Sequence, residues 1–177
     1  MPVKKVMRIA ALLHLLTTAC LFGLPLILVA GIATGQFGAN AIVAAQGGLP
    51  PGTSPGSAAI VLFLLIEAAL LAVFGYVLWQ VRALFGQYAT GDILTADSAR
   101  HITRAAVGLL ILALSGMVAQ AAQALALTWG NAPGSRQLSI ALSDDEICAA
   151  LAGGLLWVIG WAMGEAARMA AENREFI

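Results

Sequence analysis

The chain has 177 residues, of which 60% are hydrophobic and only 10% are charged, and its mean hydropathy is +0.91. Soluble domains contain ~45 to 50% apolar and ~25% charged residues, so the composition excludes a soluble globular fold. Nine basic residues balance nine acidic ones. No basic stripe or aromatic-basic module of the kind that binds nucleic acid directly is present in the sequence. The composition therefore predicts a membrane protein whose main partner is the lipid bilayer.

Four long apolar stretches follow one another along the chain, at 7–30, 58–81, 105–127 and 147–167. Each is close to the ~20 residues that an α-helix needs to cross the hydrocarbon core of a bilayer. The predicted fold class is therefore an all-α membrane protein, with four transmembrane helices in an antiparallel bundle. Residues 1–177 are expected to form a single four-helix transmembrane domain.

The segments that connect the stretches differ in composition, and they predict different local structures. Residues 31–57 contain no charged residue and are rich in Gly and Pro, which predicts a flexible outer loop with few side chains able to hold a ligand. A short apolar piece within it, Ala41 to Ala45, is expected on the membrane surface. Residues 82–104 instead predict a compact cytoplasmic corner, because Gly91 supplies a helix stop and Thr95 a helix N-cap.

The acidic run Ser143-Asp144-Asp145-Glu146 comes directly before the fourth apolar stretch. A hydroxyl residue followed three positions later by Glu is the capping-box pattern, which predicts a helix start. Cation binding at the outer face by the three acidic residues is the alternative interpretation.

The basic residues are distributed unevenly between the two sides of the predicted bundle. If the four spans alternate in direction, one side holds Lys4, Lys5, Arg8, Arg82, Arg100, Arg104, Arg168 and Arg174. Arg136 lies on the other side. Cytoplasmic segments carry the excess of Lys and Arg, so both termini are expected in the cytoplasm.

Glu67 is an unusual residue for the middle of an apolar stretch. A carboxyl group there is expensive and is by default a functional-site hypothesis. Gln120 lies at nearly the same height and Gln123 one turn further out, so a glutamine amide is expected to donate a hydrogen bond to Glu67. Gly23 and Gly153-Gly154 predict tight helix packing at this level. The cluster can be read as a structural protonated Glu, as a proton-coupled or cation-binding Glu, or as a contact with lipid or a partner.

Two further features have a structural interpretation. His101 lies between Arg100 and Arg104 and is interpreted as a surface residue. Gly160 and Gly164 have the small-xxx-small spacing that allows close helix contact, and a homo-oligomer is one arrangement that would use it.

The sequence carries no complete catalytic motif. It has no CxxC pair, no Ser/His constellation within the membrane, no metal-ligand spacing and no phosphate-binding Gly motif. We therefore expect no enzymatic activity, no cofactor and no metal site.

Two stretches resemble a known family of bacterial inner-membrane proteins, domain of unknown function 2975. They are the corner Leu84-Phe85-Gly86-Gln87-Tyr88-Ala89-Thr90-Gly91-Asp92-Ile93-Leu94-Thr95, and the fourth span with its tail, from Ser143 to Asn173. The resemblance implies four spans in the bacterial inner membrane and no established activity. Because members are often encoded beside a small helix-turn-helix regulator, it also implies such a regulator as a cytoplasmic partner.

Two functions remain open at this stage. The first is a non-enzymatic regulator, sensor or scaffold that engages a transcription regulator through a cytoplasmic face containing Arg82, Arg100, Arg104 and Arg168. The second is a small proton-coupled transporter or channel subunit that uses Glu67 and forms its pathway as a homo-oligomer.

Overall fold

The structure is a computed structural model that describes residues 3–92, 95–132, 134–138 and 142–175. In these residues the chain forms five helices and no strand: α1 (Val3–Ala33), α2 (Ala39–Gln46), α3 (Ser57–Thr90), α4 (Ala96–Thr128) and α5 (Asp144–Glu175). Ile93 and Leu94 of the predicted corner, residues 176–177 and the side chain of Arg174 lie outside the described part.

Four of the helices are long and apolar enough to cross a membrane. Their apolar segments are Lys4–Ala33, Ser57–Thr90, Ala96–Thr128 and Asp144–Glu172, and each contains one predicted stretch. A helix of 31 to 34 residues is about 46 to 51 Å long at ~1.5 Å per residue. This exceeds the ~30 Å of the hydrocarbon core, so the helices extend beyond the predicted spans.

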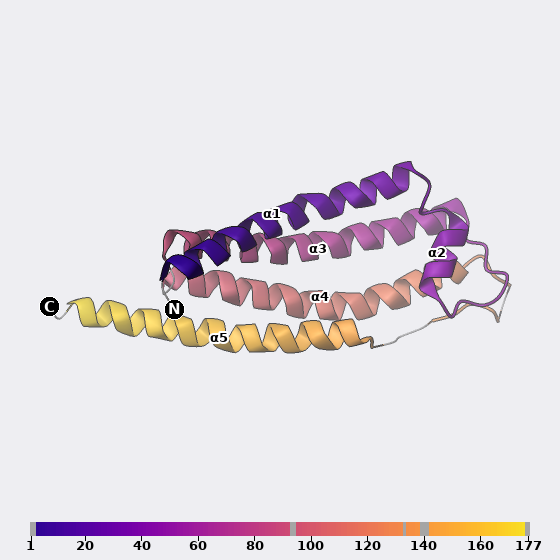
Figure 1. The fold of residues 1–177 in the computed structure, drawn as a ribbon. Coiled ribbons are helices and arrows are strands. Elements are labelled where there is room, and N and C mark those ends of the chain that lie inside the picture. The colour runs from indigo at the N-terminus through magenta and orange to yellow at the C-terminus, as the bar shows by residue number, and fades with distance from the viewer. Residues whose placement is uncertain (1–2, 93–94, 133, 139–141, 176–177) are drawn as a thin grey trace.

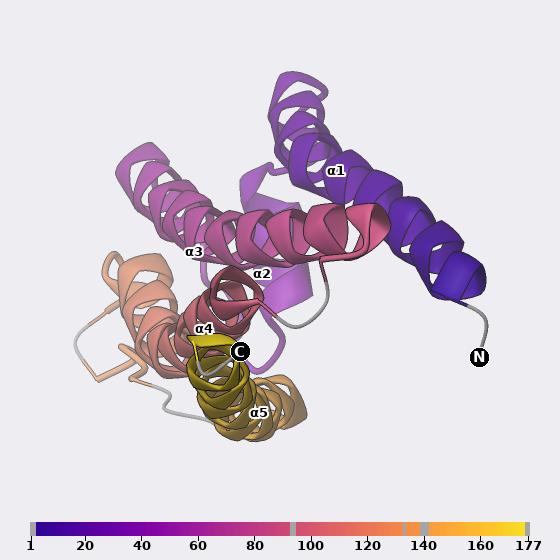
Figure 2. The same ribbon diagram turned by 90° about the vertical axis from the view of Figure 1, so that its left-hand side faces the viewer.

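The long helices pack as a row in which each contacts its neighbour along the chain. The main contacts join α1 to α3, α3 to α4, and α4 to α5 (Figures 1 and 2). Figure 1 shows both chain termini and the α3–α4 connection at one end, here called the terminal end, and α2 at the other, the α2 end. Many large apolar side chains point outward, Leu15 and Leu114 among them, as expected where lipid rather than water surrounds the helices.

Glycines set the closest helix contacts of the row. A Cβ atom at Gly160 of α5 would lie 2.5 Å from the Thr103 hydroxyl oxygen of α4, and one at Gly108 of α4 would lie 2.7 Å from Val77 of α3. These positions let neighbouring backbones approach, as small residues do between membrane helices. Gly160 thus makes its close contact with α4 of the same chain.

The tight packing predicted around Glu67 is not found. Gly153 does lie against α4, because a Cβ atom there would be 3.0 Å from the Ala106 carbonyl oxygen, but Glu67 meets α4 at Gln123, much further along that helix. Gly23 and Gly154 have no neighbouring atom within 4 Å of the added Cβ position. Counting residues along each helix therefore predicted neither the level nor the face at which these glycines lie.

The connection between α3 and α4 has the predicted helix ends. Gly91 ends α3 with φ 95°, and its backbone N–H donates to carbonyl oxygens of the last turn. That left-handed conformation is accessible to glycine at little cost. Thr95 caps α4, since the Ser98 N–H donates to its hydroxyl oxygen at 3.1 Å. Ser98 in turn donates from its own hydroxyl to Gln87 of α3 at 2.7 Å, which ties the two helices together.

Histidines link helices near the terminal end. His14 of α1 donates from Nδ1 to the Arg82 carbonyl oxygen of α3 at 2.9 Å. His101 of α4 lies 2.8 Å from the side chain of Gln80, which is 5% exposed. His101 is half-buried, so its interpretation as a surface residue was only partly right. Arg100 and Arg104 border α5, whereas His101 faces α3.

The segment 31–57 is more ordered than the predicted loop. It contains the end of α1 and the whole of α2, which packs on α3 and α4 at the α2 end. Ile42 of α2 is 3% exposed and clusters with Phe63 of α3 and Leu127 of α4. The apolar piece expected on the membrane surface is therefore a helix docked on protein.

Candidate functional site

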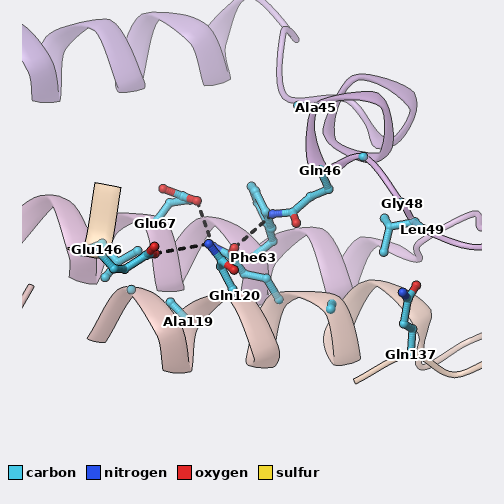
Figure 3. Close-up of a pocket in the computed structure, with 15 residues that line it drawn as sticks. Ala45, Gln46, Gly48, Leu49, Phe63, Glu67, Ala119, Gln120, Gln137 and Glu146 are labelled. Carbon is cyan, nitrogen blue, oxygen red and sulfur yellow. Dashed lines mark hydrogen bonds between the residues drawn. The ribbon is translucent and has the colours of Figure 1, made fainter. Parts of the chain in front are cut away.

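A cavity of about 630 Å³ opens beneath α2, between α3, α4 and the start of α5 (Figure 3). It is lined by Ala45, Gln46, Gly47, Gly48, Leu49, Phe63, Glu67, Leu70, Gly116, Ala119, Gln120, Gln123, Ala124, Gln137 and Glu146. From Gly116 to Ala124 the cavity extends ~12 Å along α4, at ~1.5 Å per residue. Its volume falls in the ~300 to 1,000 Å³ range of small-molecule sites.

One chain of hydrogen bonds crosses the cavity from α2 to α3. Gln123 of α4 donates from Nε2 to Glu67 Oε1 at 2.8 Å, and Gln46 of α2 donates to Gln123 Oε1 at 3.0 Å. Gln123 is 3% exposed. The expected bond from a glutamine amide to Glu67 is therefore present, with Gln123 as its donor. Gln46 couples this bond to the segment that closes the α2 end.

A second chain of hydrogen bonds reaches the cavity from α5. The Ser143 N–H donates to Glu146 Oε2 at 2.8 Å, and the Ser143 hydroxyl donates to the same oxygen. Gln120 of α4 donates to the other carboxylate oxygen, Glu146 Oε1, at 3.2 Å. The predicted helix start is confirmed, with the Glu146 half of the capping box present, and Glu146 also lines the cavity with Glu67 (Figure 3).

Gly116 makes room for Glu146. A Cβ atom at Gly116 would lie 3.0 Å from Glu146 Oε1 and 3.3 Å from its Cγ. The absent side chain leaves a notch on α4 through which the carboxylate reaches Gln120. Gly116 therefore belongs to the site although it carries no functional group.

The cavity combines acidic groups with an unused acceptor. Its lining holds two carboxyl groups, those of Glu67 and Glu146, and among the described residues no Lys, Arg or His lines it. Gln137 Oε1 is buried without a hydrogen-bond partner in the described structure. Such a group costs ~1 to 3 kcal/mol when left unsatisfied.

The four arginines of the predicted partner-binding face do not form one surface. Arg82 lies against α1, where its Nε donates to the Thr18 hydroxyl at 2.9 Å, and its guanidinium lies over Trp79 at 5.6 Å. Arg100 and Arg104 line a separate groove between α4 and α5, of about 550 Å³, with Glu165 on its α5 side. The structure therefore separates Arg82 from the α4–α5 arginines.

Arg168 belongs with the α4–α5 groove. It contacts the Glu165 carboxylate at 2.5 Å and the Glu172 carboxylate at 3.7 Å. Arg100 pairs with Asp97 of its own helix at 3.2 Å. These pairs are exposed, so each contributes little to stability, and their charged groups remain accessible at the terminal end.

Metal coordination has no ready-made centre in the described part of the chain. No group of three or more His, Cys, Asp or Glu side chains there could hold a metal ion. The two carboxyl groups of the cavity are instead each bonded to a glutamine amide.

Sequence reasoning missed Gln46, Glu146 and Gln137 as members of the site. Gln46 lay in a segment read as a flexible loop, and Glu146 was assigned to the helix cap or to an outer cation site, not to the cluster of Glu67. Gln137 lies between α4 and α5, where no periodic pattern places it. A polar residue at the end of a short apolar piece, as Gln46 is, was the one available signal.

No protein-family model, curated protein or solved structure matches the chain. The fold itself has four apolar helices long enough to span a bilayer, which is consistent with a multi-pass membrane protein. The resemblance to domain of unknown function 2975 stays a prediction from the two sequence motifs.

Proposed function

We propose that this protein is a non-enzymatic sensor or regulator of the bacterial inner membrane. In this proposal a small ligand occupies the cavity at the α2 end, and the α4–α5 arginines at the terminal end engage a cytoplasmic partner. The observation that carries it is the 630 Å³ cavity with its two carboxyl groups and its linked glutamines.

The proposed topology is an antiparallel bundle with both termini in the cytoplasm. Its support is the distribution of basic residues, since Arg100, Arg104 and Arg168 gather at the terminal end whereas Arg136 lies beyond α4 at the α2 end. The positive-inside rule then makes the terminal end cytoplasmic. The cavity accordingly faces the outer side.

Two helices connect the cavity to the proposed partner surface. Helix α4 supplies Gln120 to the cavity and Arg100 to the groove, and α5 supplies Glu146 and Glu165. The cavity and groove share no lining residue. A ligand in the cavity contacts α3, α4 and α5, so it favours the arrangement of these helices that it binds more tightly. Because α4 and α5 also form the groove, that arrangement changes the surface offered to the partner. This geometry supports a sensor more directly than a continuous pathway.

The proposed partner is a small helix-turn-helix regulator, in line with the family resemblance. The groove offers it Arg100, Arg104 and Glu165 as charged contacts, and Arg168 lies beside the groove, paired with Glu165. Arg82 is left out of this surface, because it is engaged with α1.

A proton-coupled transporter or channel subunit is the second candidate, and Glu67 is the observation that favours it. Its carboxyl group lies inside a membrane helix and borders the cavity, as expected of a proton-carrying residue. This function requires a homo-oligomer to complete a pathway through the membrane.

The experiment compares partner capture by variants at the two ends. The full chain is solubilised from membranes after in-cell crosslinking, and bound cytoplasmic proteins are quantified. Arg100→Ala, Arg104→Ala and Arg168→Ala are expected to reduce capture of one specific regulator several-fold. Arg136→Ala is the matched control, because this arginine lies at the α2 end over Trp129, and it is expected to change nothing.

The outcome separates the two candidate functions. Equal capture by the terminal-end variants and by Arg136→Ala refutes the proposed partner surface. In that case proton flux in reconstituted vesicles, compared between the unmodified chain and Glu67→Gln, becomes the decisive measurement, and flux lost in Glu67→Gln establishes the transporter.

A further inference from the structure

We infer that the cavity at the α2 end binds a small organic cation, a molecule with an ammonium or guanidinium group on an apolar body. This inference rests on the proposed ligand-binding role of the cavity and specifies the ligand's chemical class. Three features of the cavity carry it: its charge, an open carboxylate oxygen and its size.

The charge of the lining is one-sided. Glu67 and Glu146 contribute carboxyl groups, and no basic side chain among the described residues lines the cavity to balance them. An ionised carboxylate within a membrane helix requires a counter-charge or a proton. A bound ammonium or guanidinium group supplies the counter-charge, whereas an anionic ligand adds repulsion at both carboxylates.

The chain next to the cavity is also predominantly acidic. The first turn of α5 contains Asp144, Asp145 and Glu146, and Arg136 is the one basic residue of the sequence between α4 and α5. Acidic groups around an opening raise the local concentration of cations and their rate of entry.

A carboxylate oxygen remains free in the cavity. Gln123 donates to one oxygen of Glu67, and the other oxygen takes no part in that bond. An ammonium group carries three donors and a guanidinium five, so a cation of either kind can donate to the open oxygen and bring a positive charge beside the carboxyl group.

The size and walls of the cavity favour an organic molecule over a metal ion. A volume of about 630 Å³ far exceeds that of one ion, whose oxygen ligands must approach within ~2.0 to 2.6 Å. Leu49, Phe63 and Leu70 provide apolar wall beside the carboxyl groups. The lining thus combines polar and apolar surface, which suits a molecule with a charged group on an apolar body.

The experiment uses three probes with one aryl body and different charges: phenethylamine, phenethyl alcohol and hydrocinnamate. Thermal unfolding of the purified full chain in detergent is followed with rising probe concentration, because a ligand of the native state raises Tm with its concentration. Spermidine and benzyltrimethylammonium extend the cation series. Glu67→Gln and Glu146→Gln each remove one carboxylate of the cavity with little change in shape.

The matched control is Glu165→Gln, the same chemical change on α5 but in the groove at the terminal end. We expect a cation to raise Tm of the unmodified chain and of Glu165→Gln, and to lose most of that shift in Glu67→Gln. Glu146→Gln is the second test variant. It is expected to reduce the cation-induced Tm shift in the same way, and it serves as the test if Glu67→Gln fails to fold.

Three outcomes overturn the inference. They are an equal or larger shift with the alcohol or the carboxylate probe, a cation shift that persists in both cavity variants, and no shift with any cation of the series. The sensor proposal is tested separately by partner capture, so a cavity that prefers a neutral probe refutes the cation class alone.

Discussion

Replacing Gly160 by alanine is expected to separate α4 from α5 locally and destabilise the fold. The added Cβ would lie 2.5 Å from the Thr103 hydroxyl oxygen and 3.0 Å from the Thr103 backbone nitrogen. The hydroxyl can rotate away only by giving up its bond to the Ala99 carbonyl oxygen, at 3.0 Å, and the backbone nitrogen moves only with the helix. Relief therefore requires a shift of one helix relative to the other.

The magnitude follows from two opposing effects. Inserting one carbon into a well-packed contact costs ~1 to 3 kcal/mol, and alanine gains up to ~1 kcal/mol over glycine in a helix. Gly154 lies on the same helix with no atom within 4 Å of an added Cβ, so Gly154→Ala keeps the gain without the clash. The difference in unfolding free energy between the two variants is then about 1 to 3 kcal/mol, since the helix gain cancels.

The assay is reversible unfolding of the full chain in mixed micelles, with both variants measured beside the unmodified protein. Gly154→Ala is expected to equal or exceed the unmodified chain in stability, and Gly160→Ala to fall below Gly154→Ala by the stated difference. A second variant, Thr103→Ala combined with Gly160→Ala, is expected to recover part of the loss. Equal stability of Gly160→Ala and Gly154→Ala would refute the close α4–α5 contact.

Three further predictions concern single hydrogen bonds. Gln123→Leu leaves Glu67 without its amide donor and is expected to cost ~1 to 3 kcal/mol, measured by the same unfolding assay, whereas an unchanged stability contradicts the cavity network. Thr95→Ala removes the cap of α4 and is expected to cost ~0.5 to 2 kcal/mol, while Thr95→Ser keeps the cap and should be neutral. Thr18→Val removes the acceptor of Arg82 and is expected to cost ~1 kcal/mol and to raise protease or crosslinker access between α1 and α3; unchanged access argues against this link.

The helices and their ends could be predicted from the sequence because those features depend on local chemistry. An apolar run long enough for the bilayer forms a helix wherever it lies, since backbone groups in lipid must be bonded within the segment. Gly91, Thr95 and Ser143 act within one turn of their own position. Glu67 could likewise be singled out from sequence, because the expense of a carboxyl group in an apolar stretch does not depend on its neighbours.

The tertiary structure decided which other polar residues join Glu67, Gln120 and Gln123 in the cavity. The bonds of Gln123 to Gln46 and to Glu67 span 77 and 56 positions, so the meeting of these three helices depends on helix rotation and on the docking of α2. The same applies to the arginines. Arg82 and Arg100 both belong to the corner 82–104, yet Arg82 bonds Thr18 of α1 and Arg100 pairs with Asp97 of α4. Hydropathy is nearly uniform around these helices, so it sets their position along the membrane normal. Close contacts such as that at Gly160, together with side-chain hydrogen bonds, set which faces meet.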